Sequence, residues 1–374
     1  MLKLIFLYSL LIFLIFIFIL NRIWVYKTKS NPEYIYKFMK ENSNNEVAIL
    51  VKYNGEILGQ CNENKMLPLA SVAKIIVAIE FSKQVAERKL IASNLINIKE
   101  IEKYFIPNSD GGSYQEWLKT LGDREQVTLL EVAQGMIHYS SNANTSYLMN
   151  ILGIENTNKL LGELQLKKHE NIFPATEALY IPLKLNGYDQ NFSNIEYILE
   201  KFEKMDSNEY YRESIALNEE WNRNPLSKEH KNQIMNKLNL DFQRIWSNRM
   251  PKSTANEYMS ILEKLNSKTF FPKDVHNYLD KIMEQLMLNP RNQEWLKHAG
   301  QKGGSTLNIL NSAFYAEDIR NNKLEVVFFS NCLEEKDVLK RRKLEKSLNA
   351  FHIQLLKSEA FRNSVRKNLK SLNQ

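Results

Sequence analysis

The chain has 374 residues, of which 44% are hydrophobic and 25% are charged, with a formal net charge of +7. This length allows one or two domains with a sizeable core, and the composition is that of an ordinary folded protein. Residues 334–374 supply nearly all of the excess charge, because they hold eleven Lys and Arg against five Asp and Glu. The rest is close to neutral, which argues against a nucleic-acid-binding protein and predicts a solvated basic helix at the C-terminal end.

The N-terminal stretch, residues 4–20, is almost wholly apolar and uncharged, and with its flanks it approaches the length that crosses a bilayer. A cleaved signal peptide is the alternative, but no A-x-A-like site follows it. We therefore expect residues 1–29 to be a signal-anchor helix and its flank, in a single-pass protein of the cell membrane. The positive charges after the segment favour a body inside the cell, but the chemistry suggested below favours an extracytoplasmic domain.

Two cysteines, Cys61 and Cys332, lie far apart and without C-x-x-C spacing. This excludes a disulfide framework and favours two buried thiols, although a single bridge between them stays open. None of the six histidines stands in a metal-ligand spacing. We expect no metal and no cofactor.

The first elements after the N-terminal stretch are two strand-like runs, VAILVKY and EILGQC, separated by Asn54-Gly55. Asn-Gly between such runs predicts a β-hairpin, because both residues accept the positive φ angles of a type I′ turn. A helix beginning near Ser71 follows. Mostly helical sequence then continues to about residue 295, and within it Thr128 and Glu131 form the pattern of a capping box.

Two further strands are predicted near the C-terminal end, within residues 305–318 and 323–333, joined by the turn IRNNK. The tail is predicted to be a helix whose apolar stripe consists of Leu344, Leu348, Phe351 and Leu355. The strands at each end of the chain are too few to form a buried sheet of their own. We therefore expect them to form one antiparallel sheet, with the helical part inserted between them in sequence and the tail helix covering the sheet. Residues 185–246 are polar, weakly patterned and without a predicted role.

Three short motifs carry candidate chemistry: Ser71 and Lys74 as S-x-x-K, Ser140 and Asn142 as S-x-N, and Lys302 in KGGS. Residues 71 and 74 share one helix face, where a buried lysine is costly unless its charge or its lone pair is used. Each motif alone is weak. The first motif lies on a helix after a hairpin, the second follows an inserted helix, and the third opens a late strand. In this order and context, the three motifs resemble those of the serine β-lactamase and penicillin-binding protein superfamily.

The resemblance spans roughly residues 45–350 and is strongest to class A β-lactamases and related serine hydrolases. It implies an α/β (α+β) fold with an antiparallel five-stranded sheet flanked by helices and an inserted all-helical subdomain, here with the N-terminal transmembrane helix added. The hydrolase domain would occupy residues 30–374. Its sheet part would lie at about 45–70 and 296–374, and its helical part at about 71–295.

The resemblance also implies catalytic roles. Ser71 would be the nucleophile and Lys74 its base, with a pKa lowered by burial and by the charge of Lys302. Ser140 would relay a proton to the leaving nitrogen, and Lys302 would attract a substrate carboxylate. The backbone N–H groups of Ser71 and Ser305 would form the oxyanion hole.

Further residues are assigned to substrate binding by the same resemblance: Asn142, which would hold the substrate amide, with Gly304, Ser305 and Thr306. Tyr104 is a candidate for the rim of the site, with a core tyrosine as the alternative. Two positions depart from the family pattern. Gly303 stands where family members commonly have a hydroxyl that binds the substrate carboxylate, and Ser305 or Thr306 could compensate for its loss. Ser141 stands where many members have aspartate.

The deacylation loop of class A enzymes, E-x-x-L-N, has its best match in the segment YRESIALNEEW. Aligned in this way, Ser214 occupies the position of the catalytic glutamate, Glu213 lies beside it and Asn218 supplies the asparagine. Acylation is therefore expected, whereas rapid deacylation lacks a base.

The expected function is that of a membrane-anchored serine hydrolase, acylated at Ser71 by a β-lactam or a D-alanyl peptide-like amide of the cell wall, and slow to deacylate. Three alternatives stay open: a true class A-like β-lactamase, a catalytically weak module that binds wall peptide, and a tethered structural protein with accidental motifs. The sequence leaves the oligomeric state unknown.

Overall fold

The fold is organised around a five-stranded antiparallel sheet with the strand order β2-β1-β9-β8-β7. The computed structural model describes residues 10, 13–18, 22, 24–42, 46–187, 194–370 and 372. Strands from both ends of the chain meet in this sheet: β1 (Val47–Tyr53), β2 (Glu56–Cys61), β7 (Leu296–Ser305), β8 (Leu310–Asp318) and β9 (Lys323–Ser330). The pairing of β1 with β9 therefore joins strands that lie near opposite ends of the chain.

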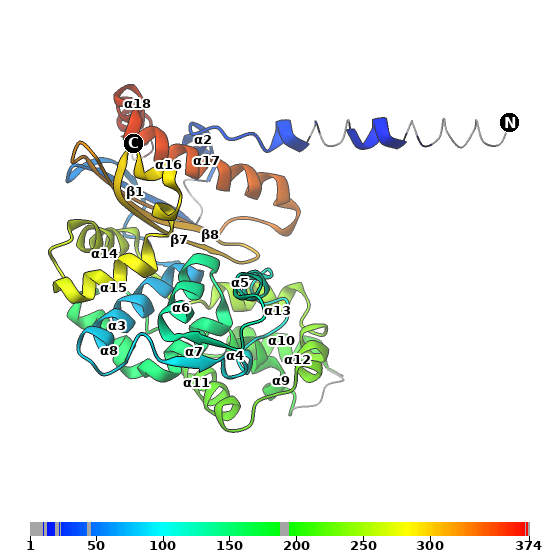
Figure 1. Cartoon of the computed structure of the whole chain (residues 1–374). Coiled ribbons are helices and arrows are strands. Elements are labelled where there is room, and N and C mark those ends of the chain that lie inside the picture. Colours follow the sequence, from blue (N-terminus) through cyan, green and yellow to red (C-terminus); the bar gives the residue numbers. More distant parts are fainter. Residues whose placement is uncertain are drawn as a thin grey trace.

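Helices cover both faces of the sheet (Figure 1). On one face lie α2 (Tyr34–Asn42), α17 (Val338–Lys357) and α18 (Glu359–Lys370). On the other face lie α14 (Ala255–Ser267), α15 (Lys273–Met283) and α3 (Lys74–Ala86). Side chains alternate along each strand, so Val327 and Phe329 of β9 enter the core on the α3 and α14 side, whereas Val326 and Phe328 enter the core under α17.

The remaining elements form the helical part. Its helices are α4 (Ile98–Glu102), α5 (Ser113–Leu121), α6 (Leu129–Gln134), α7 (Asn142–Leu152), α8 (Ile154–Glu163), α9 (Ile181–Leu185), α10 (Ile195–Lys204), α11 (Ser207–Arg223), α12 (Lys228–Met235) and α13 (Leu240–Asn248), with α16 (Pro290–Gln293) leading into β7. Two short ribbons pair β3 (Leu67–Pro68) with β6 (Lys252–Ser253) and β4 (Leu95–Asn97) with β5 (Gln126–Thr128).

Three local predictions are confirmed. Asn54 and Gly55 adopt φ angles of 51° and 81° between β1 and β2, as a type I′ turn requires. Thr128 and Glu131 form the capping box at the start of α6. The four apolar residues of the tail stripe are buried in α17 against the sheet: Leu344, Leu348, Phe351 and Leu355.

The position of Lys302 in its strand differs from the expectation. We expected it to open a strand, but β7 begins six residues earlier, at Leu296, and Lys302 is the seventh of its ten residues. Strand β7 is at the edge of the sheet and pairs only with β8 among the strands of the described chain. Its exposed and polar residues Lys297, His298 and Gln301 hide the apolar alternation by which the other strands were found.

The predicted transmembrane helix at residues 4–20 is wrong. Among the described residues, no helix has both the length and the apolar character needed to cross a membrane. Only residues 10 and 13–18 of this stretch are described, and the others lie outside the described residues. An apolar composition is not sufficient for a span, which needs about 20 consecutive helical residues.

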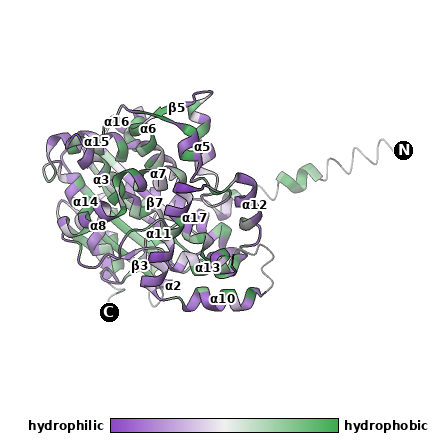
Figure 2. Cartoon of the chain, turned by 90° about the horizontal axis from the view of Figure 1, so that it is seen from below, coloured by the Kyte–Doolittle hydropathy of each residue, from purple (hydrophilic) through white to green (hydrophobic). Residues whose placement is uncertain are grey.

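The polar segment of unknown role folds largely into the helices α10 to α13, which share a third core. Residues 188–193 of this segment lie outside the described residues. Large aromatic side chains fill that core, among them Phe202, Trp221 and Phe242. Hydrophilic and hydrophobic residues alternate along α10 and α13 (Figure 2), so each helix has one face for the core and one for solvent.

Both cysteines are free thiols: Cys61 is buried, and Cys332 is partly buried. Burial raises the pKa of Cys332 to about 11, which keeps this thiol protonated and unreactive near neutral pH.

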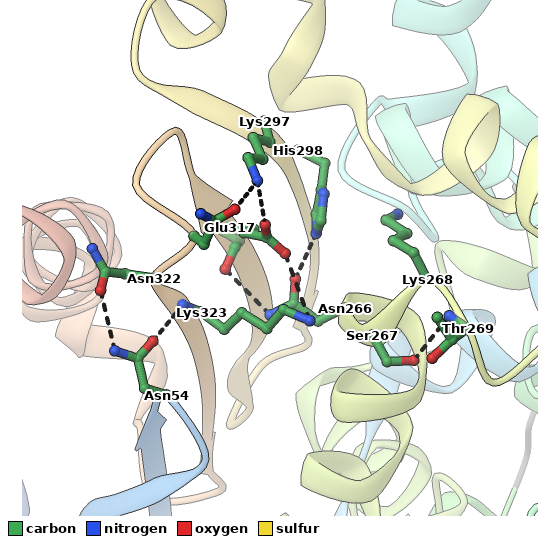
Figure 3. A network of polar contacts seen from close by, with 12 residues as sticks. Asn54, Asn266, Ser267, Lys268, Thr269, Lys297, His298, Glu317, Asn322 and Lys323 are labelled. Carbon is green, nitrogen blue, oxygen red and sulfur yellow. Dashed lines mark hydrogen bonds and ion pairs between the residues drawn. The ribbon is translucent and has the colours of Figure 1, made fainter.

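A buried polar network joins α14 to the middle of the sheet. The Asn266 side chain donates hydrogen bonds to the Glu325 carboxyl at 2.5 Å and to the Ala316 carbonyl at 3.2 Å. Its oxygen lies 2.7 Å from His298 Nε2 (Figure 3), so this imidazole nitrogen must carry the proton. Burial raises the pKa of Glu325 to about 7 and is also the main cause that lowers the pKa of His298 to about 4.

Strand β7 lies directly against the short turn that precedes α3. A Cβ built on Gly304 would lie 2.7 Å from the Leu69 carbonyl oxygen and 3.0 Å from the Ser71 amide nitrogen. Cβ atoms do not come so close to backbone atoms, so glycine is needed for this approach. The neighbouring Gly303 is different, because its Cβ would meet only the Asn311 carbonyl, at an ordinary 3.7 Å.

We therefore expect Gly304→Ala to lower the free energy of unfolding by about 1–3 kcal/mol, because the strand must move away from the turn. Gly303→Ala is the matched control and should change it by less than about 0.5 kcal/mol. Urea unfolding of the two variants measures both values. Equal effects would contradict the close approach of Gly304 to the turn.

We also expect Glu325→Gln to stabilise the protein increasingly between pH 5 and pH 8. The folded-state pKa of Glu325, about 7, lies above the unfolded value, so stability is lost as the pH rises toward and through 7. Above pH 7 the free energy of unfolding of Glu325→Gln should exceed that of the wild type by about 3 kcal/mol. Burial raises the pKa of Glu317 in β8, but the hydrogen bond from Lys297 and the electrostatic effects of His298, Lys297 and Lys323 together lower it below its ordinary value. The stability that Glu317 contributes is therefore lost only as the pH falls below about 5, so Glu317→Gln should show no such rise between pH 5 and pH 8, and parallel trends would contradict this account.

Candidate active site

The candidate nucleophile, Ser71, lies in a 3₁₀ turn (Ala70–Ala73) immediately before α3. Ala70 has a φ of 46°, a left-handed conformation that is uncommon for a residue with a side chain. This bend places Ser71 in the wall of a cavity of about 720 Å³. Ser71 is partly exposed, and its hydroxyl makes no hydrogen bond within the described part of the chain.

Lys74 begins α3, one turn after Ser71, and is 6% exposed. Its Nζ donates hydrogen bonds to the Ser140 carbonyl at 2.7 Å and to Asn142 Oδ1 at 2.8 Å. Burial and then the charge of Lys302 lower the pKa of Lys74 well below its usual value, and the carboxylate of Asp110 opposes them. A neutral amine has two N–H groups, so these two hydrogen bonds would leave its lone pair free to accept a proton.

Ser140 lies between the two lysines. It has a φ of 66° at the end of a π-helical turn (Gly135–Tyr139). Its hydroxyl accepts a hydrogen bond of 2.9 Å from Lys302 Nζ, which also donates to the Gly303 carbonyl at 3.0 Å. Lys302 is 3% exposed, and burial lowers its pKa to about 7. One residue therefore contacts both amines, one through its carbonyl and the other through its hydroxyl.

The start of α7 fixes the position of Asn142. The buried Ser141 is the N-cap of this helix, and its hydroxyl oxygen accepts a hydrogen bond from the Asn144 amide at 3.3 Å. Ser141, which replaces the aspartate of many family members, therefore caps the start of α7. The Asn142 side chain accepts from Lys74 and donates to the Ser109 carbonyl at 3.2 Å.

The end of β7 forms the opposite wall of the cavity. Gly304 approaches the Ser71 amide, and Ser305 and Thr306 follow it along the wall. The Thr306 hydroxyl shares a hydrogen bond with Ser247 of α13. The cavity thus brings together eight residues predicted for the site: Ser71, Lys74, Ser140, Asn142, Lys302, Gly304, Ser305 and Thr306.

The other four predicted residues do not line this cavity. Tyr104 is buried, and its hydroxyl donates to Asn222, which fits the alternative of a core tyrosine. In α11, Glu213 pairs with Lys184, and the Ser214 hydroxyl donates to the Tyr210 carbonyl at 2.8 Å. Asn218 donates to Glu177 at 3.1 Å. The match that assigned the three α11 residues to a deacylation loop is a short one, in a chain where Asn, Glu and Leu are abundant.

Sequence reasoning missed two carboxylates near the cavity, Glu177 and Asp110. Glu177 is fully buried directly behind Thr176 of the cavity wall, and it accepts hydrogen bonds from Ser146 at 3.1 Å and from Asn218. Burial raises its pKa. The sequence does carry an indication of Glu177, because it is the only acidic residue in the apolar run IFPATEALYIPL. Lys74 was noticed in the same way, as a charged residue within an apolar run.

Asp110 lines the cavity itself. The sequence around it, NSDGGS, is typical of a turn, so it gave no sign of a role in the site. Metal ligation has no support in the described residues, where no group of three His, Cys, Asp or Glu side chains is placed to hold an ion.

Comparisons with known proteins give a family match for part of the chain and similar folds for most of it. Residues 33–195 match the model of the β-lactamase enzyme family. A search of curated protein sequences gave no match.

Solved structures are similar in fold. A β-lactamase from Chitinophaga pinensis is 15% identical with a TM-score of 0.51, over 87% of this chain and 99% of that one. The TLA-1 extended-spectrum β-lactamase is 13% identical with a TM-score of 0.50, over 87% and 98% of the two chains. A class A β-lactamase from Bacteroides cellulosilyticus is 15% identical with a TM-score of 0.49, over 92% and 99%.

Identities this low show the fold alone. Together with the family match, they support a serine hydrolase that acts on amides. The chain is therefore similar to the β-lactamase enzyme family over residues 33–195, and its fold is similar to that of solved β-lactamases over most of its length.

Proposed function

We propose that the protein is a serine hydrolase that is acylated at Ser71 by a β-lactam or by a D-alanyl peptide-like amide, and that it deacylates slowly. The observation that carries the proposal is the position of Ser140, whose carbonyl accepts from Lys74 and whose hydroxyl accepts from Lys302, in the cavity that Ser71 also lines. A binding module has no need for two buried amines beside two serines, because each buried amine is costly.

Acylation would begin with a proton moving from the Ser71 hydroxyl to the lone pair of neutral Lys74. The Ser71 oxygen then bonds to the substrate carbonyl carbon, and the Ser71 amide, with the Ser305 amide opposite, stabilises the negative oxygen. As the C–N bond breaks, the Ser140 hydroxyl gives its proton to the leaving nitrogen. Lys302, 2.9 Å from that hydroxyl, returns a proton to Ser140 when it is charged.

Substrate binding would use the groups that remain free. Asn142 has two N–H donors, of which Ser109 engages one, so the other can hold the substrate amide. Lys302 would attract the substrate carboxylate. Glycine at 303 supplies no hydroxyl for that carboxylate, and the Thr306 hydroxyl already bonds Ser247, which leaves Ser305 as the free hydroxyl of this segment.

Slow deacylation follows from where the carboxylates lie. Glu177 is behind the wall, with one oxygen bonded to Ser146 and the other to Asn218. Hydrolysis of the acyl-enzyme needs a base that touches a water at the ester, and a carboxylate held in this way does not reach into the cavity. Asp110 does line the cavity, but its Oδ2 accepts from the Tyr114 and Asn142 amides and its Oδ1 is enclosed. Wall peptides lie outside the cytoplasm, so an extracytoplasmic location is part of the proposal.

We expect a fluorescent penicillin to label the wild-type protein and mass spectrometry to place the adduct on Ser71. Ser71→Ala should abolish labelling, and Lys74→Ala should slow it by about 10²- to 10⁴-fold, the usual range for loss of a general base. Ser260→Ala, on α14 away from the cavity, is the control and should label normally. A folded wild-type protein without adduct would favour the binding module instead.

We further expect a chromogenic cephalosporin to give a stoichiometric burst, with one product per protein molecule, followed by very slow turnover. The reason is that acylation has its groups in place whereas deacylation lacks a base. Stopped-flow absorbance measures both phases. Fast steady turnover would identify a true β-lactamase, and loss of that turnover in Glu177→Gln would then show that Glu177 reaches the ester.

A further inference from the structure

One wall of the cavity is apolar, and the proposed mechanism does not use it. Two segments form this apolar wall, residues 172–176 and residues 243–251, and both lie within the described part of the chain. They contribute nine of the residues that line the cavity, of which seven are apolar, two are polar and none is charged. The charged groups of the cavity belong to other segments, so the apolar wall offers a bound molecule hydrophobic contact.

The largest side chains of the apolar wall are Phe173, Trp246 and Met250. All three belong to the core of the helices α10 to α13, yet they stay 7–9% exposed. Every other buried member of that core except Met205 is at most 5% exposed. The three side chains also line the cavity, where a bound molecule can cover the surface that the core leaves open.

Polar and aromatic contacts hold these side chains in place. The Trp246 indole N–H donates to the Ala175 carbonyl at 2.6 Å, so its one polar atom is satisfied within the wall. The Phe173 ring lies edge-to-face against Tyr210 and Tyr211 of α11, with ring centroids 5.6 and 6.1 Å apart. The two rings therefore present carbon surface in a fixed position, and covering it costs little side-chain entropy.

The apolar wall is joined both to the nucleophile turn and to the end of β7. The Leu69 amide, two residues before Ser71, donates to the Pro251 carbonyl at 2.9 Å. On α13, the Ser247 hydroxyl shares a hydrogen bond with the Thr306 hydroxyl. The wall is therefore continuous with the site at which the acyl-enzyme would form.

Position along β7 determines which part of a substrate meets the apolar wall. Lys302, beside Ser140, lies on the leaving-group side in the proposed mechanism. Ser305, whose amide would bind the negative oxygen, comes three residues later, about 10 Å along the strand. Thr306 follows and contacts the wall. A substrate with its carbonyl at Ser305 therefore directs its leaving part toward Lys302 and its acyl part toward the apolar wall.

We propose that the apolar wall binds an aromatic or bulky aliphatic group in the acyl part of the substrate. The substrate class is then an amide with a hydrophobic group on the acyl side of the scissile carbonyl and a carboxylate on the leaving side. Phe173, Trp246 and Met250 are specificity determinants here and take no part in bond breaking. This inference rests on the proposed function, because it assigns a specificity to the same site.

The test uses two penicillins that differ in one group. Benzylpenicillin has a phenyl ring on its acyl side chain, and 6-acetamidopenicillanic acid has hydrogen in its place. Their second-order acylation rate constants are measured by competition with a fluorescent penicillin, whose own rate constant is measured in each protein. We expect the wild-type protein to prefer benzylpenicillin and Trp246→Leu to lower the ratio of the two rate constants about three- to tenfold, the usual range for loss of an aromatic contact.

Phe242→Leu is the matched control. Phe242 lies on the same helix and in the same core as Trp246, but it is 1% exposed and is not among the residues that line the cavity. This variant removes a ring from the core, as Trp246→Leu does, and should leave the ratio unchanged.

Should Trp246→Leu fail to fold, the wild-type protein gives a second test with penicillins that have linear acyl chains of increasing length. The acylation rate constant should rise about two- to fourfold for each methylene that the wall covers. A rate constant that does not change along the series would overturn the specificity assignment.

The outcomes separate the two proposals. Failure of both penicillins to acylate a folded wild-type protein overturns the proposed function. Acylation by both with a ratio that Trp246→Leu does not change, or that Phe242→Leu lowers as much, overturns the specificity assignment alone. An equal loss with both penicillins also overturns it, because Trp246 would then act only by holding residues 172–176 in place.

Discussion

The contact of two buried lysines with one serine is the constraint on which the site depends. Lys74 reaches the carbonyl of Ser140, and Lys302 reaches its hydroxyl. Each amine is taken out of water, and the charge of Lys302 adds to the burial of Lys74 in lowering its pKa. This arrangement needs a rigid support, because a small opening would let water in and restore the ordinary charge of both groups.

The support comes from three distant segments whose backbones are held close together. The left-handed φ of Ala70 turns the chain into α3, and the left-handed φ of Ser140 ends the π-helical turn before α7. Strand β7 brings Lys302 from the far end of the chain, and Gly304 lets it lie against the nucleophile turn. Pairing of β1 with β9 fixes this geometry, because it ties the hairpin before the nucleophile to the C-terminal strands.

The additional helices α10 to α13 are connected to the same cavity. Trp246 of α13 lines it and donates from its indole nitrogen to the Ala175 carbonyl at 2.6 Å, and Ser247 bonds Thr306 at the end of β7. From α11, Asn218 holds Glu177 behind the wall. A segment with a hydrophobic core of its own thus forms part of the wall and also determines where one buried carboxylate points.

Local signals in the sequence determined the hairpin at Asn54-Gly55, the capping box at Thr128, the apolar stripe of α17 and the three motifs of the site, because each depends on residues a few positions apart. Tertiary structure alone decided the rest. The extent of β7 was hidden by its edge position, and the places of Glu177 and Asp110 depend on partners in other elements. Burial and partners set the charge and direction of a carboxylate, and neither can be read from its neighbours along the chain.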